Sequence, residues 1–179
     1  MIPHSSARVF FALWPDAPAR KALYALALEV ASQREGRAPS EANLHVTVVF
    51  LGSVTASRIE TLGAIAAECA RLCPSFDLAL DALGGTSQGI AWLAPRVVPP
   101  PLASLHASLS SCLAGEGFAM ERRRFRPHVT LARHCVRPVR RLAVEAIAWR
   151  VERLALVAST PAPGGSRYSD LATWPLEAT

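Results

Sequence analysis

Apolar and polar residues along this chain form short extended runs, separated by three longer stretches with helical spacing. Runs rich in β-branched and aromatic residues predict strands at 8–15, 43–52, 76–81, 90–95, 126–133, 151–159 and 167–174. Apolar residues three and four apart predict helices at 17–33, from Ile59 to Leu72, and at 101–114. The predicted order is strand–helix–strand–helix–strand–strand–helix–strand–strand–strand.

This order predicts an α+β fold with mainly antiparallel sheets and outer helices. Strands and helices do not alternate as they do in a doubly wound parallel sheet, and the sequence has no Gly-rich phosphate loop of the Rossmann or Walker type. A strand that carries His-Val-Thr occurs twice, at 43–52 and at 126–133, which indicates two similar lobes. At 179 residues, we expect one domain over 1–179, built from two closely packed lobes.

The composition favours a soluble cytoplasmic protein without membrane contact. Hydrophobic residues make up 51% of the chain and charged residues 18%, which excludes a disordered chain. No apolar run approaches the roughly 20 residues that span a bilayer, and the early run Val9–Trp14 lacks a signal-peptide cleavage pattern. The four cysteines form no CxxC pair, so we expect reduced thiols and no structural zinc.

Arginine carries almost all of the positive charge. The net charge is +5 with a pI of about 9.6, and Lys21 is the only lysine. A guanidinium offers a planar donor fork that suits phosphate oxygens. Four arginines fall within Arg122–Arg126, just before the second motif. Two interpretations stay open for this cluster: it guides an RNA strand, or it is a solvated charged turn.

The repeated motif places an imidazole and a hydroxyl side by side. The stretches "NLHVTVVFLG" and "RPHVTLAR" contain His45 and Thr47, and His128 and Thr130, inside otherwise apolar runs. Residues two apart on a strand share a face, so each histidine should lie beside its threonine. If the two lobes face each other, one cleft holds two imidazoles and two hydroxyls.

This set of groups suits phosphodiester cleavage, which needs a base for the attacking oxygen and an acid for the leaving oxygen. Imidazoles titrate near neutral pH and can serve in both roles, while the hydroxyls hold the phosphate. His4, His106 and His134 lack the threonine partner, and His106 is better placed for packing. The 14 acidic residues are scattered, which disfavours a two-metal site.

The paired motifs resemble those of the two-histidine (2H) phosphoesterase superfamily, and most of all the RNA 2′,3′-cyclic phosphodiesterases first described as 2′-5′ RNA ligases. The likeness runs from "RVFFAL" through both motifs to "VERLALVASTPAPGGSRYSDLATWPL". It implies a bilobal fold with a central cleft, and cofactor-free, metal-independent hydrolysis of 2′,3′-cyclic phosphates on RNA ends or nucleotides. By position, His45 would be the proton donor and His128 the proton acceptor, although the symmetry of the motifs lets these roles exchange. Thr47, Thr130 and Arg133 would bind the phosphate.

Some features of the sequence fit the resemblance less simply. Strict alternation puts Arg133 on the face opposite His128, so it reaches the cleft only if the strand ends or bulges first. Val49 stands where the family often has a basic residue. Phe11 and Phe50 are expected to pack in the core rather than to contact a base.

Other functions that fit the same motifs are 2′-5′ RNA ligation, hydrolysis of another cyclic phosphate such as ADP-ribose cyclic phosphate, and a non-catalytic nucleotide- or RNA-binding module. We predict a monomer.

Overall fold

Two four-stranded sheets form the framework of the protein. The structure, a computed structural model, describes residues 6–163 and 165–178, so His4 lies outside the described residues. The first sheet has the order β2-β1-β7-β8 and consists of β1 (Ser6–Leu13), β2 (Val46–Thr55), β7 (Arg153–Ala162) and β8 (Gly165–Pro175). The second has the order β5-β4-β3-β6 and consists of β3 (Phe76–Gly85), β4 (Ala91–Ala94), β5 (Val129–Ala132) and β6 (Leu142–Val151). Neighbouring strands are antiparallel in both sheets.

The two sheets repeat one arrangement. The helices are α1 (Ala17–Gln33), α2 (Ile59–Arg71) and α3 (Pro100–Gly115). In each lobe a strand, a helix and a motif-bearing strand follow one another, as β1–α1–β2 and as β4–α3–β5. Both motif strands, β2 and β5, lie at an edge of their sheet. The predicted α+β class and the two similar lobes are confirmed.

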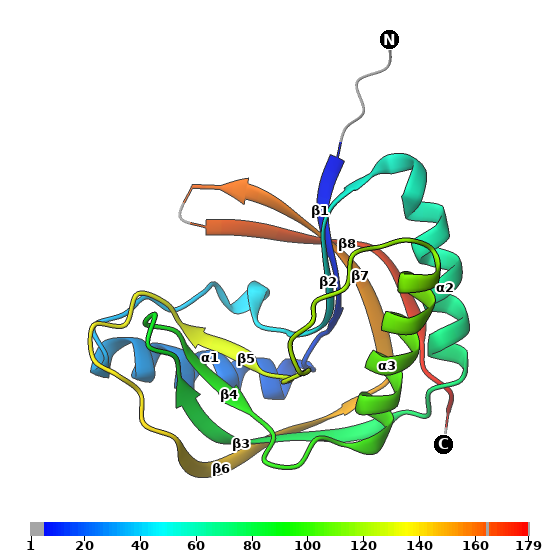
Figure 1. Ribbon diagram of the computed structural model, residues 1–179. Helices are drawn as coiled ribbons and strands as arrows, with labels where there is room; N and C mark the ends of the chain where they lie inside the picture. Colours follow the sequence, from blue (N-terminus) through cyan, green and yellow to red (C-terminus); the bar gives the residue numbers. More distant parts are fainter. Residues whose placement is uncertain (1–5, 164, 179) are drawn as a thin grey trace.

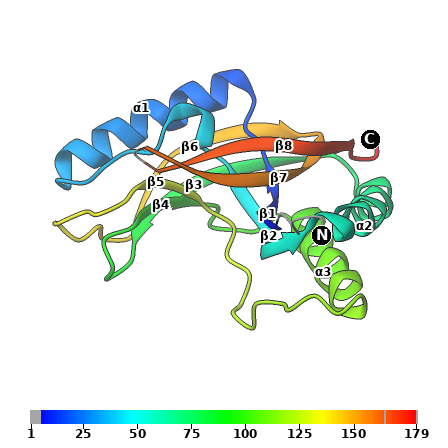
Figure 2. The same cartoon turned by 90° about the horizontal axis from the view of Figure 1, so that it is seen from above.

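In each lobe, the helix between the two strands packs against the sheet of the other lobe. Helix α1 follows a strand of the first sheet yet packs against β5 and β6 of the second, whereas α2 and α3 pack together on the first sheet (Figures 1 and 2). The carboxylate of Asp16 caps α1 by accepting from the Ala19 N–H at 2.8 Å. Buried side chains from both sheets and all three helices join one apolar cluster. This shared core fixes the position of edge strand β2 relative to edge strand β5.

Strand β6 is the element that the sequence analysis missed. It covers Leu142–Val151, where we expected no strand, and the strand expected at 151–159 is β7, at Arg153–Ala162. Three alanines (Ala143, Ala146 and Ala148) favour helix, and β6 is an edge strand with most of its side chains exposed. A register shift against β3 between Leu80 and Ala82 also breaks the alternation that marks a strand.

Candidate active site

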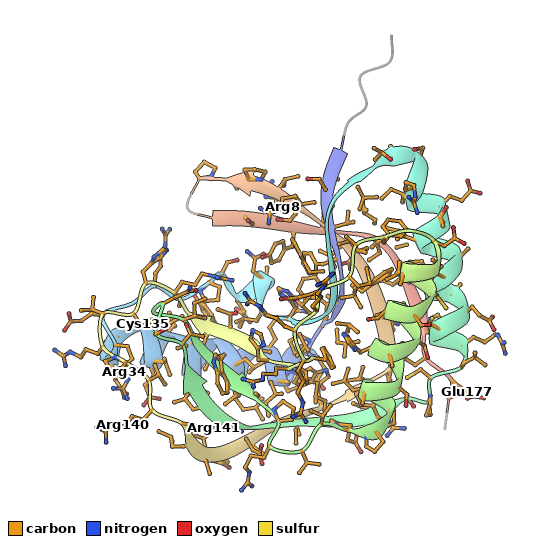
Figure 3. The ribbon with its side chains drawn as sticks, viewed as in Figure 1. Arg8, Arg34, Cys135, Arg140, Arg141 and Glu177 are labelled. Carbon is orange, nitrogen blue, oxygen red and sulfur yellow. The ribbon has the colours of Figure 1, made fainter. Side chains whose placement is uncertain are left out.

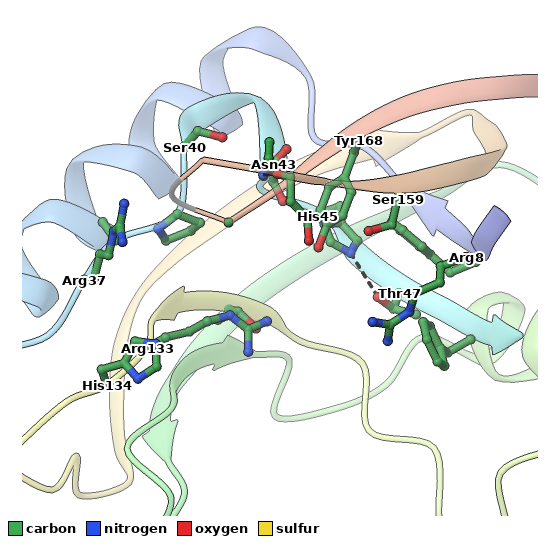
Figure 4. A pocket seen from close by; sticks show the side chains of 18 of the residues that line it. Arg8, Arg37, Ser40, Asn43, His45, Thr47, Arg133, His134, Ser159 and Tyr168 are labelled. Atoms are coloured by element: carbon green, nitrogen blue, oxygen red, sulfur yellow. Dashed lines mark hydrogen bonds between the residues drawn. The ribbon is translucent and has the colours of Figure 1, made fainter. Parts of the chain in front are cut away.

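The first motif stands where the chain enters β2. His45 is the residue before the strand, and the side chains of Val46 and Val48 on the opposite face are buried. The Nδ1 of His45 lies 2.7 Å from the carbonyl oxygen of Asn43, and its Nε2 lies 3.0 Å from the Thr47 hydroxyl, as the dashed line in Figure 4 marks. A carbonyl oxygen only accepts, so Nδ1 carries a proton and Nε2 is the nitrogen left to exchange one.

The second motif repeats the contact between Nδ1 and a backbone carbonyl at β5. His128 precedes the strand, and its Nδ1 donates to the carbonyl oxygen of Arg126 at 2.8 Å. In both motifs the carbonyl two residues upstream therefore holds the imidazole in the same tautomer. Two histidines held in this way are suited to proton transfer through Nε2.

One cavity of about 760 Å³ brings the two motifs together. His45, Thr47, His128, Thr130 and Arg133, the five residues predicted from the sequence, all line it. Further lining residues are Arg8, Phe10, Arg37, Ala38, Pro39, Ser40, Asn43, Phe50, His134, Ser159, Ala162, Pro163, Gly165, Ser166 and Tyr168. No aspartate or glutamate is among the described lining residues, so the cavity presents cations and neutral donors. Such a lining favours an anionic ligand.

Arg133 reaches the cavity because β5 ends before it. The strand stops at Ala132, and its register against β4 shifts within the motif. The backbone of Arg133 then pairs with that of Arg37 through two hydrogen bonds of 2.8 and 2.9 Å. His134 follows in the left-handed region at a φ of 57°. The structure thus overrides the strict alternation considered from the sequence.

The paired backbone of Arg37 and Arg133 depends on a close approach at Gly36. A Cβ at this position would lie 2.8 Å from the sulfur of Cys135 and 3.1 Å from the carbonyl oxygen of Arg133. Figure 4 shows the Arg133 and Arg8 side chains entering the cavity from opposite sides, with Arg37 and His134 on the Arg133 side. The cavity therefore holds a guanidinium on each flank of the histidine and threonine pairs.

Comparisons with known proteins agree with this architecture. The family model of the 2′-5′ RNA ligase superfamily matches residues 14–161. The chain belongs to the 2′-5′ RNA ligase superfamily. Over 172 residues it is 32% identical to an RNA 2′,3′-cyclic phosphodiesterase of Escherichia coli, covering 94% of this chain and 96% of the relative. The resemblance inferred from the paired motifs is confirmed.

Solved structures support the superfamily assignment. A crystal structure of Escherichia coli LigT complexed with 3′-AMP is 31% identical with a TM-score of 0.87, covering 96% of this chain and 99% of that one. A protein of Thermus thermophilus, at 24% identity and a TM-score of 0.82, shares the fold over 94% of this chain and 97% of its own.

The two histidines of this superfamily member differ in their surroundings. His45 is enclosed by the rings of Phe10, Trp14 and Tyr168, whose centroids lie 4.9, 5.5 and 5.2 Å from that of the imidazole. Burial lowers the pKa of His45, and the Asn43 carbonyl offsets part of this effect. The positive charges of His128 and Arg133 lower the pKa further. His128, by contrast, is exposed.

Several cavity residues were not predicted from the sequence. Phe50 was expected in the core but is 45% exposed and lines the cavity, whereas Phe11 is fully buried as expected. Arg8 lies with its guanidinium carbon 5.5 Å from the centre of the Phe50 ring. Tyr168 lies on β8, far from both motifs in the sequence, and no motif around it indicates a place in the cavity. Val49 is buried at 6% exposure, so in this member it is a core residue.

Within residues 6–163 and 165–178, no group of three His, Cys, Asp or Glu side chains is arranged to hold a metal ion. Cys69, Cys73, Cys112 and Cys135 are free thiols, and burial raises the pKa of Cys69 to about 11. His106 stacks on Phe125, which agrees with the packing role expected for it.

Proposed function

We propose that this protein hydrolyses 2′,3′-cyclic phosphodiesters, on RNA ends or on nucleotides, to 2′-phosphomonoesters. The observation that carries the proposal is the pair of imidazoles in one cavity whose described lining includes no carboxylate. Each imidazole has its Nδ1–H bonded to a backbone carbonyl and its Nε2 left for proton transfer. The relative named RNA 2′,3′-cyclic phosphodiesterase supports this substrate class. The crystal structure of LigT complexed with 3′-AMP supports a nucleotide as the kind of ligand bound.

In the proposed reaction, His128 accepts a proton from water while the water oxygen bonds to phosphorus. The bond between phosphorus and the 3′ oxygen breaks, and His45 gives its Nε2 proton to that oxygen. The product keeps its phosphate on the 2′ oxygen, and a proton returned through solvent resets both imidazoles. Each proton transfer typically contributes about 10²- to 10⁴-fold to the rate.

The surroundings of the two histidines support this division of roles. His128 is the exposed imidazole, which suits a group that takes a proton from water. His45 is enclosed by aromatic rings, and its lowered pKa makes its proton easier to transfer to the 3′ oxygen once substrate is bound. A bound phosphodiester anion opposes the lowering of the pKa of His45 and favours the protonated form needed of an acid.

Thr47, Thr130 and Arg133 hold the phosphate in this proposal. Both threonines line the cavity together with the imidazoles, and Arg133 enters it from the flank. Donors aimed at the non-bridging oxygens stabilise the charge that develops on them, typically by about 3–4 kcal/mol for one donor. The Thr47 hydroxyl also bonds Nε2 of His45, so it links the acid to the phosphate site.

We further propose that the reaction needs no metal ion, because the two imidazoles supply both proton transfers and Arg133 supplies a positive charge.

A monomer in the cytoplasm and a single domain over 1–179 also remain predictions. No helix in the described part of the chain is long and apolar enough to cross a membrane.

The test is a product assay with 2′,3′-cyclic AMP in excess chelator. We expect 2′-AMP as the product, separated from 3′-AMP by chromatography. Formation of 3′-AMP would show that the 2′ oxygen, and not the 3′ oxygen, is the leaving group. Loss of turnover on chelation would contradict the metal-free reaction. Absence of any product, together with tight nucleotide binding, would indicate a binding module instead.

A further inference from the structure

A strongly basic segment leads into the second motif and plays no part in the reaction described above. Residues 122–126, here called the basic segment, hold Arg122, Arg123, Arg124 and Arg126. The segment belongs to the irregular connection between α3 and β5, which runs along the margin of the molecule in Figure 2. All four arginine side chains are exposed. Their close spacing makes this one of the most positive stretches of the chain.

Apolar side chains fix the backbone of this connection. Phe118, Met120 and Phe125 pack against the core, and Pro127 is buried. Phe125 stacks on His106 with ring centroids 3.9 Å apart and planes 8° apart. The Arg58 guanidinium lies 3.9 Å from the centre of the Phe118 ring. The connection is therefore anchored at several points, and its arginines extend from a fixed backbone into solvent.

The arginines of the basic segment have little negative charge near them. Arg123 lies 3.7 Å from Glu121, in a pair whose side chains are 90% and 65% exposed, and such pairs contribute little. Among the described residues, Arg122, Arg124 and Arg126 form no ion pair. Elsewhere, Arg96 and Arg137 lie 2.6 Å from Asp81 and Glu35. Neighbouring like charges repel, and a polyanion on this surface would relieve that repulsion.

The basic segment is close to the proposed reaction centre. The carbonyl of Arg126 holds His128, and Arg124 is four residues before that histidine. A fully extended chain spans at most about 3.6 Å per residue, so these two positions lie within about 14 Å of each other. Figure 1 shows the connection descending from α3 past β2 before it enters β5. The cavity of about 760 Å³ has the size of a small-molecule site, so a longer RNA strand must extend beyond it along the surface.

We propose that the basic segment binds backbone phosphates of the RNA strand upstream of the cyclic phosphate. This inference rests on the proposed function and adds to it a preference for RNA ends over free cyclic nucleotides. Guanidinium groups bind phosphate oxygens through paired hydrogen bonds, and a cationic surface can follow a single strand without reading its sequence. Each contact releases counterions, so the preference weakens as salt rises.

The test compares two substrates and two matched variants. The substrates are 2′,3′-cyclic AMP and a ten-nucleotide RNA that ends in a 2′,3′-cyclic phosphate. One variant combines Arg122→Gln with Arg124→Gln and leaves Arg126, whose carbonyl orients His128. The control combines Arg140→Gln with Arg141→Gln and removes the same charge. Arg140 and Arg141 lie at the lower left of Figure 3, well separated in that view from the cavity residue Arg8.

We expect the Arg122/Arg124 variant to lose about tenfold in kcat/KM on the RNA at low salt and to match wild type on cyclic AMP. For the RNA, the slope of log kcat/KM against log salt should become less steep by about 1.4 in this variant. Each phosphate contact on a single strand contributes about 0.7 to that slope, and two contacts are removed. The control should retain the wild-type salt dependence.

Three results would overturn the proposal: unchanged RNA kinetics in the Arg122/Arg124 variant, equal losses on both substrates, or a larger loss in the control. Fluorescence anisotropy with a labelled RNA ending in a 3′-hydroxyl measures binding without turnover. It therefore separates failure of this proposal from failure of the proposed reaction. If wild type lacks turnover, weaker binding by the Arg122/Arg124 variant alone would still support the basic segment, and equal binding by all three proteins would reject it.

Discussion

The two His-x-Thr motifs hold their imidazoles by the same Nδ1 contact but in different surroundings. Each imidazole donates from Nδ1 to the carbonyl two residues before it, at 2.7 Å for His45 and 2.8 Å for His128. His45 is packed among Phe10, Trp14 and Tyr168, while His128 is open to solvent. Local sequence therefore builds the same tautomer twice, and the tertiary environment makes the two histidines unequal. This inequality allows one to act as acid and the other as base.

Removal of either imidazole is the strongest test of this comparison. His45→Ala and His128→Ala should each lower kcat by about 10²- to 10⁴-fold, because each removes one proton transfer. Steady-state kinetics on 2′,3′-cyclic AMP measures the loss, and circular dichroism verifies the fold. Activity near that of wild type in either variant would rule out a paired mechanism.

Removal of the hydroxyls should have a smaller and unequal effect. Thr47→Val and Thr130→Val should each slow the reaction by about 10²- to 10³-fold, through the loss of one phosphate donor. The loss should be greater for Thr47→Val, because the Thr47 hydroxyl also bonds Nε2 of His45 at 3.0 Å. Thr47→Ser keeps the hydroxyl and serves as the matched control. A larger loss in Thr130→Val would contradict the link between Thr47 and His45.

Sequence patterns account for the two motifs and for most of the strands, but less well for what surrounds them. The spacing within "HVTV" and "HVTL" was enough to place four side chains in one cavity. Phe50 and Tyr168 could not be assigned this way, because their exposure depends on how the edge of the first sheet meets the second lobe. Arg133 required a strand end and the left-handed His134, which simple alternation does not include. Strand β6 was not predicted because its alanines and its register shift obscure the alternation of apolar and polar residues that marks a strand.

The aromatic enclosure of His45 can be opened at one ring. Tyr168→Ala should expose the imidazole to water and raise the pKa of His45 toward its usual value, because burial is the main cause of its lowering. Tyr168→Phe keeps the ring and should leave that pKa unchanged. Nuclear magnetic resonance titration of the His45 imidazole protons measures the effect. An unchanged titration in Tyr168→Ala would show that this ring does not set the pKa.

The same enclosure predicts a modest pH dependence of stability. Folding lowers the pKa of His45 below the ordinary value of 6.5, so protonation favours the unfolded chain. This contribution to stability is present above that value and is lost as the pH falls through the folded-state pKa. Urea unfolding between about pH 8 and pH 5 should show a smaller decline for His45→Gln than for wild type, and equal declines would argue against the lowered pKa.

The central claim is that two imidazoles in one cavity perform acid and base roles together. The most direct measurement is the pH dependence of kcat/KM for wild type on 2′,3′-cyclic AMP in excess chelator, which reports the ionisations of the free enzyme. The account predicts a bell with both limbs in the range where histidines titrate. A rate that is flat from about pH 5 to pH 9, or that has a single limb, would contradict the paired-histidine mechanism.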